Sequence, residues 1–385
     1  MNKLKIMSVF GTRPEAIKMA PLILEMRNNP RIESTVCITA QHRQMLDQVL
    51  NIFNITPDYD LDIMQKSQTL EDITSKVLTG LSDVFKKAQP DVVLVHGDTT
   101  TSFAAALSAF YNKIKIGHVE AGLRTHNLYS PFPEEANRQL ISILSNFNFA
   151  PTPANKHNLL MQACPANHIY ITGNTVIDAL KTTVYPNYSF DYKPLNDIDY
   201  TKQIIVVTAH RRENLGQPLQ NICDSLKTLA ESYGNDIEII YPVHLNPAVQ
   251  NTVRATLEGI PNVHLTPPLN VSDLHNLMNK AYFIMTDSGG LQEEAPALGK
   301  PVLVLRTETE RPEAVESGTV QLAGVETPKI LELSKKLLDN AAFYNKMAKA
   351  TNPYGDGFAS RRIVDCLLYE FGFYSTPAED FVWNK

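Results

Sequence analysis

Short apolar runs alternate with segments of helical periodicity along almost the whole chain. In the first half the runs with the pattern of strands are Lys5–Phe10, Val36–Ala40, Asp91–His96, Ile114–Val119, Phe147–Ala150 and Ile169–Thr172. The segments between them with helical spacing are Ala16–Met26, Arg43–Leu50, Leu70–Lys87, Thr101–Tyr111, Glu134–Ser145 and Ala154–Gln162. This alternation predicts an α/β fold with parallel sheets.

The alternation pauses once and then starts again. Residues Tyr185–Thr201 are rich in Tyr, Pro, Asp and Asn and have little periodicity, which is typical of an irregular connection. Strand-like runs then return at Gln203–Thr208, Ile237–Pro242, Val263–Leu265 and Tyr282–Met285. We therefore predict two doubly wound domains, residues 1–172 and 173–363, with a ligand in the cleft between them. In such sheets, sites form at the carboxyl ends of the strands.

Composition and charge exclude several classes of protein. The 385 residues carry a net charge of −6, which makes general binding of nucleic acid a poor hypothesis. The four cysteines, Cys37, Cys164, Cys223 and Cys366, are widely scattered, so neither a zinc site nor a disulfide framework is indicated. No apolar stretch approaches the roughly 20 residues of a membrane span, and no signal peptide is visible. We expect a cytoplasmic enzyme without a metal.

The clearest candidate for a ligand site is Thr286–Pro301, TDSGGLQEEAPALGKP. An apolar run ends in Ser288, Gly289 and Gly290, and a helical pattern follows. Glycines allow backbone N–H groups to approach an oxyanion, and the start of a helix adds partial positive charge. Glu293 and Glu294 follow in the first turns of that helix, and one of them is placed to accept hydrogen bonds from a ribose diol. The alternative is a tight strand–helix turn with no ligand.

Polar residues follow three strands of the first half. Arg13 lies on the first strand–helix turn and Lys18 one helical turn later, so both are candidates for phosphate contacts. Asp98 follows the strand-like run that ends at His96, and Glu120 follows the run that ends at Val119. Glu134 begins a predicted helix. A solvated lysine, a helix cap and a helix-dipole carboxylate are the simpler alternatives. Carboxylates that crowd one site shift one another's pKa, so one can act as a base and another as an acid.

The second half repeats this placement. His210 and Arg211 follow its first strand, His244 follows the next, and Arg311 comes after a later strand. We expect His210 to contact phosphate or move a proton. Arg211 and Arg212 are expected to support a leaving diphosphate, and Arg311 to contact the sugar or a phosphate. A lone histidine in the position of His244 more often has a structural role than a ligand role.

These motifs together resemble the non-hydrolysing UDP-N-acetylglucosamine 2-epimerases of bacteria. The resemblance rests on FGTRPEAIKMAP, TAQHRQMLDQ, VLVHGDTTT, GHVEAGLRT, SPFPEEANR, ITGNTVIDAL, TAHRREN, YPVHLNP, TDSGGLQEEAP and NPYGDG, which together cover nearly the whole chain. It implies a GT-B-like fold of two Rossmann-like domains with the active site in the cleft between them. It also implies a final helix, about residues 364–385, that returns to the first domain, a homodimer, and no metal or nicotinamide cofactor.

The resemblance also implies roles for individual residues. The catalytic group would be Asp98, Glu120, Glu134 and His210. UDP and the sugar would be held by Arg13, Lys18, Arg211, Ser288, Gly289, Gly290, Glu294 and Arg311. Members of the family also bind a second UDP-N-acetylglucosamine as an allosteric activator, and Gln41, His42, Gln44 and His244 resemble that site.

The expected reaction is reversible inversion at the second sugar carbon, supplying the synthesis of surface or capsular polysaccharide. The hydrogen on that carbon has no neighbouring carbonyl, so elimination of UDP to a glycal and its re-addition is more plausible than a free carbanion. Three rivals stay open: a hydrolysing epimerase that releases N-acetylmannosamine and UDP, a GT-B glycosyltransferase, and a nucleotide-sugar sensor without activity.

Overall fold

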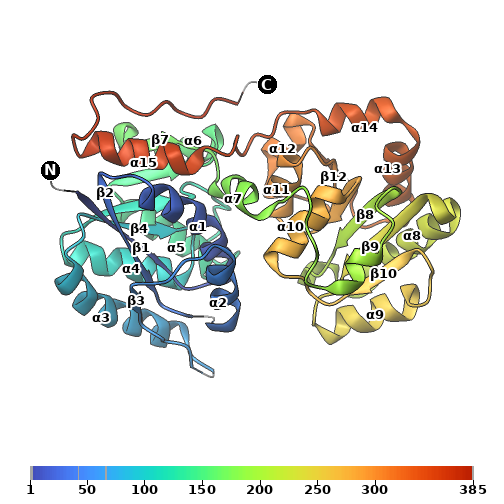
Figure 1. Ribbon diagram of the computed structural model, residues 1–385, viewed down its shortest axis with the longest axis horizontal. Helices are drawn as coiled ribbons and strands as arrows, with labels where there is room; N and C mark the ends of the chain where they lie inside the picture. The colour runs from blue at the N-terminus through green and yellow to red at the C-terminus, as the bar shows by residue number, and fades with distance from the viewer. Residues whose placement is uncertain (1–2, 42, 66, 384–385) are drawn as a thin grey trace. The chain divides into compact units, whose positions relative to one another are not determined.

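The structure is a computed structural model that describes residues 3–41, 43–65 and 67–383. The chain folds into two compact units. The first runs as far as Thr182 and also includes Tyr354–Val382, and the second contains Thr183–Pro353. Each unit is a parallel sheet with helices packed around it, which confirms the predicted α/β fold with two Rossmann-like halves (Figure 1).

The sheet of the first unit has the spatial order β3-β2-β1-β4-β5-β6-β7. Its strands are β1 (Leu4–Phe10), β2 (Ile32–Ile38), β3 (Tyr59–Asp60), β4 (Val92–His96), β5 (Lys115–Val119), β6 (Phe147–Ala150) and β7 (Ile169–Ile171). All its pairings are parallel. Chain order reverses between β1 and β4, and ligands of such sheets bind at the carboxyl ends of the strands at this point.

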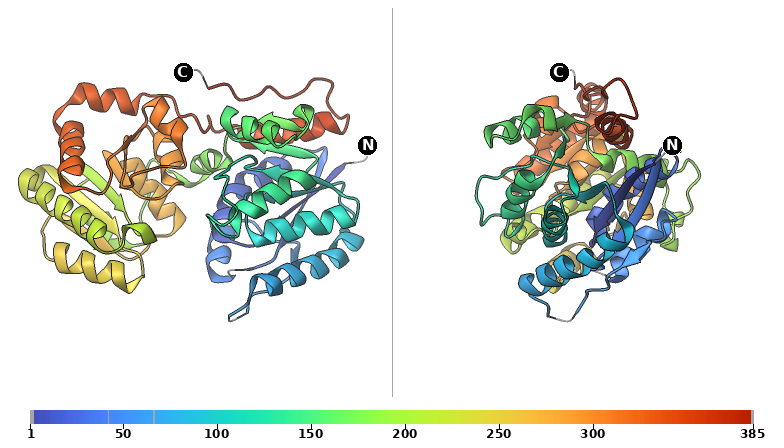
Figure 2. Two further views of the ribbon diagram at one scale, coloured as in Figure 1. Left: turned by 180° about the vertical axis from the view of Figure 1, so that it is seen from behind. Right: turned by 90° about the vertical axis from the view of Figure 1, so that its left-hand side faces the viewer.

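Helices cover the sheet of the first unit. They are α1 (Arg13–Arg27), α2 (Arg43–Ile52), α3 (Leu70–Ala88), α4 (Thr100–Tyr111), α5 (Glu134–Leu144), α6 (Pro153–Met161), α7 (Thr175–Thr183) and α15 (Ala359–Glu370). Helix α4 packs between α3 and α5, whereas α1 packs with α2 and α15 (Figures 1 and 2). The sheet is therefore doubly wound.

The second unit repeats this plan with the order β10-β9-β8-β11-β12-β13. Its strands are β8 (Gln203–Thr208), β9 (Ile237–Pro242), β10 (Val263–Thr266), β11 (Phe283–Thr286), β12 (Val302–Val304) and β13 (Val320–Leu322). Its helices are α8 (Gln217–Tyr233), α9 (Pro247–Leu257), α10 (Val271–Lys280), α11 (Leu291–Ala297), α12 (Pro312–Ser317), α13 (Thr327–Asp339) and α14 (Ala341–Ala348). Here the reversal lies between β8 and β11, so the loops after these two strands are the expected ligand-binding loops.

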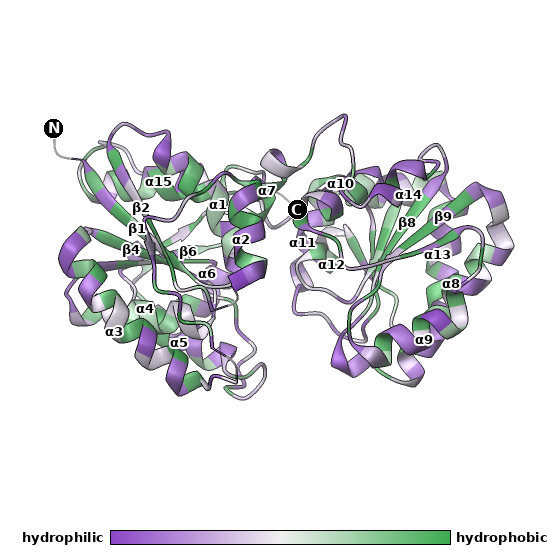
Figure 3. Ribbon diagram, turned by 60° about the horizontal axis from the view of Figure 1, so that its bottom comes forward, coloured by the Kyte–Doolittle hydropathy of each residue, from purple (hydrophilic) through white to green (hydrophobic). Residues whose placement is uncertain are grey.

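The hydrophobic pattern explains why these elements form. Every residue of β4 is buried, and in Figure 3 the strands of both units are mainly hydrophobic whereas the helices carry both kinds of residue. Helix α3 begins with a capping box in which Thr69 and Asp72 satisfy each other's backbone N–H groups. Thr99 caps α4 by accepting a hydrogen bond from the N–H of Ser102. Because Thr99 serves as the cap, the preceding Asp98 is not needed for that purpose.

The C-terminal segment belongs to the first unit. Asp178 of α7 accepts hydrogen bonds from the N–H groups of Ala359 and Ser360, at 3.1 and 2.8 Å, and so caps α15 from outside the helix. The predicted boundary lies between residues 172 and 173, whereas the chain passes from one unit to the other between Thr182 and Thr183. The difference arises because α7 is tied to the C-terminal segment.

None of the helices in the described ranges is long and apolar enough to cross a membrane.

Candidate functional site

Glu15 shapes the loop after β1, which leads to the candidate Arg13 at the first position of α1. Its carboxylate is buried and accepts hydrogen bonds from the N–H groups of Gly11 and Thr12, at 3.0 and 2.8 Å. It also accepts from the hydroxyls of Thr99 and Ser102, at 2.7 and 2.8 Å. One side chain therefore joins the loop after β1 to the loop after β4. Glu15 was not predicted as a site residue, although its place at the third position of a Pro-containing first turn is a capping signal.

Glu120 lies directly after β5 and is nearly buried, with 10% of its side chain exposed. Its backbone has φ of +62°, a left-handed conformation that is uncommon for a residue with a side chain. Its Oε2 lies 2.5 Å from Lys18 Nζ. His96 Nε2 is 2.8 Å from the same oxygen, although this approach lacks the alignment of a hydrogen bond. The predicted catalytic residue Glu120 and the predicted phosphate ligand Lys18 are thus partners of each other.

The electrostatic environment keeps Glu120 ionised. Burial alone would raise the pKa of this carboxyl, because a charge is poorly solvated inside the protein. The positive charge of Lys18 and the His96 ring outweigh that effect and hold the pKa well below its usual range. Such a carboxylate is charged at neutral pH. In that state it can accept a proton or stabilise positive charge, and once it has taken a proton it can return it.

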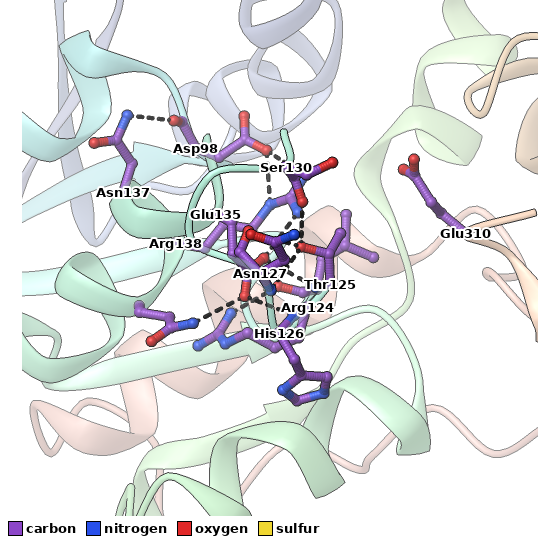
Figure 4. A network of polar contacts seen from close by, with 12 residues as sticks. Asp98, Arg124, Thr125, His126, Asn127, Ser130, Glu135, Asn137, Arg138 and Glu310 are labelled. Atoms are coloured by element: carbon purple, nitrogen blue, oxygen red, sulfur yellow. Dashed lines mark hydrogen bonds and ion pairs between the residues drawn. The ribbon is translucent and has the colours of Figure 1, made fainter. Parts of the chain in front are cut away.

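Asp98 is the centre of a second polar group, on the loop after β4 (Figure 4). Its Oδ2 lies 2.7 Å from Arg138 Nη2, and Arg138 Nε donates to the same oxygen at 2.8 Å. The side chain of Asn137 donates to the backbone carbonyl of Asp98 at 2.8 Å. Arg138 and Asn137 lie on α5, which begins at the candidate Glu134. The structure thus joins the Asp98 loop to the helix of Glu134, which is itself half-buried.

Arg138 and Glu135 are functional candidates that the sequence analysis missed. Glu135 is fully buried and pairs with Arg138 at 3.2 Å. It also accepts from the N–H groups of Thr125 and His126, at 3.0 and 3.2 Å, so it holds the loop before α5 (Figure 4). Burial opposes its ionisation, but hydrogen bonds and Arg138 lower its pKa. The sequence feature that could have indicated this pair is its spacing, because residues three apart lie on one face of a helix.

His118 supports the Asp98 loop from within the sheet. Its ring is buried, and Nε2 lies 2.7 Å from the backbone carbonyl of Gly97. Burial lowers the pKa of His118 to about 3, so the ring is neutral and Nε2 donates the hydrogen bond. This bond fixes the backbone immediately before Asp98.

In the second unit, Asp287 organises the loops after β8 and β11. It is fully buried, and its Oδ2 accepts hydrogen bonds from the N–H groups of His210 and Arg211, both at 2.7 Å. The side-chain amide of Asn214 donates to the same oxygen at 3.0 Å. Asp287 therefore fixes the backbone of two predicted site residues.

The ring of His210 is partly exposed and stacks on that of His244, with 5.0 Å between centroids and 5° between planes. Burial is the main cause that lowers the pKa of His210, with His244 and Arg211 acting in the same direction and Asp287 against it. A neutral ring is therefore favoured near neutral pH, and it can donate or accept a hydrogen bond.

Two guanidinium groups converge on the glycine loop after β11. A Cβ atom placed on Gly289 would lie 3.9 Å from Arg211 Nη2 and 3.9 Å from Arg311 Nη2, which are ordinary contact distances. Arg311 is buried and its Nε donates to the buried Glu293. Glu293 thus aligns Arg311 within the unit. Two neighbouring positive groups beside the half-buried backbone of Gly289 form an arrangement suited to an anion.

Glu294 lies on the same loop-and-helix segment. A Cβ atom on Gly290 would lie 3.2 Å from Glu294 Oε1 and 4.0 Å from Ser288 Oγ. The predicted residues Ser288, Gly289, Gly290, Glu294, Arg211 and Arg311 are therefore gathered around one loop of the second unit.

The residues predicted for an activator site are distributed over both units. Gln41 accepts a hydrogen bond from the Thr101 hydroxyl at 2.9 Å, and Gln44 is exposed on α2. His42 lies outside the described residues. His244 is exposed and stacks on His210. In the part of the chain that the structure describes, no cluster of three or more His, Cys, Asp or Glu side chains has the arrangement of a metal site.

Comparisons with known proteins show the family to which the chain is similar. Residues 24–368 match the family model described as UDP-N-acetylglucosamine 2-epimerase. The chain is 54% identical to the UDP-N-acetylglucosamine 2-epimerase of Bacillus subtilis (strain 168), an alignment that covers 99% of each chain. It is 50% identical to the Escherichia coli (strain K12) enzyme of the same name, over 94% of this chain and 98% of that one.

A solved structure is similar over nearly the whole chain. It is the crystal structure of UDP-GlcNAc 2-epimerase from Neisseria meningitidis bound to UDP-GlcNAc. The TM-score is 0.85 at 51% sequence identity, with 95% of this chain and 100% of that chain covered.

Proposed function

The chain belongs to the UDP-N-acetylglucosamine 2-epimerase family, and from that premise we propose that it interconverts UDP-N-acetylglucosamine and UDP-N-acetylmannosamine reversibly, without hydrolysis. The observation that carries the proposal is Glu120, a nearly buried carboxylate that follows β5 of the doubly wound sheet and is kept ionised by Lys18 and His96. A charged carboxylate in such a place is suited to proton removal or to stabilising positive charge on a sugar ring.

The proposed chemistry is elimination followed by addition. A carboxylate takes the proton from the second sugar carbon while the bond between the first carbon and the UDP oxygen breaks. A double bond forms between the two carbons, which gives a glycal and UDP. UDP then adds back to the first carbon, and a proton is delivered to the opposite face of the second carbon. No oxidant, reductant or water is consumed.

The two units supply different parts of this reaction. In the first unit, Asp98, Glu120 and Glu134 share the acid and base work, and Arg138 holds Asp98 in place. In the second unit, Arg211 and Arg311 converge on Gly289 and support the charge of the diphosphate. His210 donates a hydrogen bond to the leaving oxygen, and Glu294 accepts hydrogen bonds from the ribose. Arg13 adds a phosphate contact, whereas Lys18 acts on Glu120.

Two further features belong to this proposal. Exposed apolar side chains on the neighbouring helices α4 and α5, namely Phe110, Tyr111, Leu140 and Ile143, support a homodimer formed through the first unit. Sedimentation that shows only a monomer at micromolar concentration would refute it. A second UDP-N-acetylglucosamine as activator, a cytoplasmic location and a role in surface polysaccharide synthesis stay predictions.

The test is proton NMR of UDP-N-acetylglucosamine with the enzyme in D₂O. We expect the signal of the second-carbon proton to disappear while intact UDP-N-acetylmannosamine rises to a plateau. Asp98→Asn, which preserves size, is the matched control and should slow both changes together. Accumulation of UDP with free N-acetylmannosamine would instead identify the hydrolysing branch. Absence of both exchange and product would contradict the epimerase proposal and favour a transferase or a sensor.

A further inference from the structure

A buried histidine that the proposed reaction does not use stands behind Glu294. His275 lies on α10 and is 3% exposed. Its Nε2 is 3.2 Å from Glu294 Oε2, and its Nδ1 is 2.7 Å from the hydroxyl of Thr183. Thr183 is fully buried, and the second unit begins at this residue. The three side chains thus form a continuous hydrogen-bonded row, although Glu294 follows Thr183 by more than a hundred residues.

The carboxylate decides which nitrogen of His275 presents a hydrogen to it. A carboxylate without a proton only accepts hydrogen bonds, so Nε2 of His275 donates to Glu294. The Thr183 hydroxyl is the partner of Nδ1, and the two hydrogen bonds together fix the plane of the ring. A hydrogen bond to one ring nitrogen of a histidine orients the other nitrogen toward its own partner. Hydrogen bonds to metal-bound histidines orient the ring toward the metal in the same way.

The row leaves one oxygen of Glu294 for another partner. Oε2 is engaged by His275, whereas Oε1 lies toward Gly290, 3.2 Å from the position of a Cβ atom there. The carboxylate is thus turned so that one oxygen faces the Ser288–Gly290 loop. Without His275 the side chain would retain several rotamers, and holding one of them would cost conformational entropy at the moment of binding.

The other end of the row is also held firmly. Asn276, next to His275 on α10, donates to the backbone carbonyl of Thr183 at 2.7 Å and accepts from the N–H of Tyr185 at 2.9 Å. Because these two hydrogen bonds hold the backbone from the Thr183 carbonyl to Tyr185, the Thr183 hydroxyl is a stable reference point for the ring.

We propose that His275 is a positioning residue for nucleotide recognition: with Thr183 as its anchor, it orients the Glu294 carboxylate toward the ribose hydroxyls of a uridine diphosphate. This inference rests on the proposed function, because it takes the glycine loop of the second unit as the nucleotide site. It adds that ribose recognition depends on a residue that never touches the nucleotide. The competing explanation is a histidine that only fills the core.

The experiment compares the binding of UDP and 2′,3′-dideoxy-UDP by isothermal titration calorimetry. A hydrogen bond to a charged group typically changes affinity by about ten- to hundredfold, so the wild-type protein should prefer UDP by at least about tenfold. Glu294→Ala should bring that preference close to one. Thr183→Val, which keeps the shape but removes the hydroxyl, and His275→Asn should each reduce the preference several-fold without weakening the binding of the dideoxy compound.

The control is Thr183→Ser, which retains the hydroxyl and should restore the preference. Combining His275→Asn with Glu294→Ala should cost no further preference beyond Glu294→Ala alone. If His275 only fills the core, its replacement weakens both nucleotides equally and the preference stays unchanged, which overturns the inference. If His275→Asn fails to fold, Thr183→Val decides alone. Wild-type protein that binds neither nucleotide would refute the proposed function, whereas equal binding of both would refute the inference only.

Discussion

Replacing Lys18 with methionine tests the central electrostatic argument, because it removes a charge and keeps nearly the same shape. In the native protein Lys18 Nζ lies 2.5 Å from Glu120, and the two side chains are 18% and 10% exposed. The pKa of Glu120 is depressed, so the pair contributes stability above the usual carboxyl pKa and loses it as pH falls through the lowered value. Lys18→Met removes one of the two groups that keep Glu120 ionised.

The size of the effect follows from the distance and the burial. Unit charges about 4 Å apart attract by roughly 4 kcal/mol at an effective dielectric constant of about 20. His96 remains near Glu120, so we expect about 3 kcal/mol to be lost, or roughly a hundredfold in the protonation equilibrium of the carboxyl. Burial then dominates and raises the pKa of Glu120 toward neutrality.

The assay is the pH dependence of kcat/KM for epimerisation between about pH 5 and 9, together with the affinity for UDP. We expect the acidic limb of the Lys18→Met profile to move toward neutral pH, with UDP affinity nearly unchanged. Lys18→Arg, which retains the charge, should keep the native profile. An unchanged profile combined with a large loss of UDP affinity would show that Lys18 is a phosphate ligand, as the sequence alone suggested, and would refute the reasoning.

Four further predictions concern single residues. Asp98→Asn should lower kcat by about 10²- to 10⁴-fold with little change in melting temperature, as kinetics and calorimetry can establish; normal kcat would exclude Asp98 from catalysis. Gly289→Ala should leave stability nearly unchanged, because the nearest atoms are 3.9 Å from its Cβ, but should weaken UDP binding at least about tenfold in calorimetry; native affinity would contradict the anion site. In Asp287→Asn the N–H groups of His210 and Arg211 face either an amide oxygen, which is a weaker acceptor than a carboxylate, or an amide N–H, which is itself a donor. The free energy of unfolding in urea should therefore fall by about 2–4 kcal/mol, and a loss below about 0.5 kcal/mol would refute this. The pKa of buried His118 is about 3, whereas that of an unfolded histidine is about 6.5, so the free energy of unfolding should fall as pH drops below about 6.5. The expected loss from this residue is about 2 kcal/mol at pH 5. His118→Gln should remove that share of the loss, as urea titrations at pH 7 and pH 5 can establish.

The order of the elements and the places of the loops could be predicted from the sequence. The apolar run of β4 is buried at every residue, and a strand buried on both faces has a continuous pattern that needs no knowledge of its neighbours. The carboxyl ends of parallel strands share an edge, so Asp98 and Glu120 could be assigned to one edge of the sheet before their contacts were known. The glycine loop after β11 was visible for the same reason.

Which side chains meet could not be predicted in this way. Lys18 and Glu120 are 102 residues apart, and the sequence placed Lys18 at a phosphate because its local setting, one turn into a helix, shows no carboxylate. Arg138 appeared as an ordinary charge on α5 until the fold brought it to Asp98, 40 residues earlier. Such contacts depend on helix rotation and strand register, which long-range packing sets.

The sequence by itself determined the α/β architecture, the family and the set of loops that carry the chemistry, because these depend on local periodicity and on motifs read along the chain. The tertiary structure alone decided the partners of the charged groups: Lys18 with Glu120, Arg138 with Asp98, and His275 with Glu294. The physical reason is that burial and distance govern whether a carboxylate is ionised and where it points. Both quantities exist only after residues far apart in the chain have been packed together.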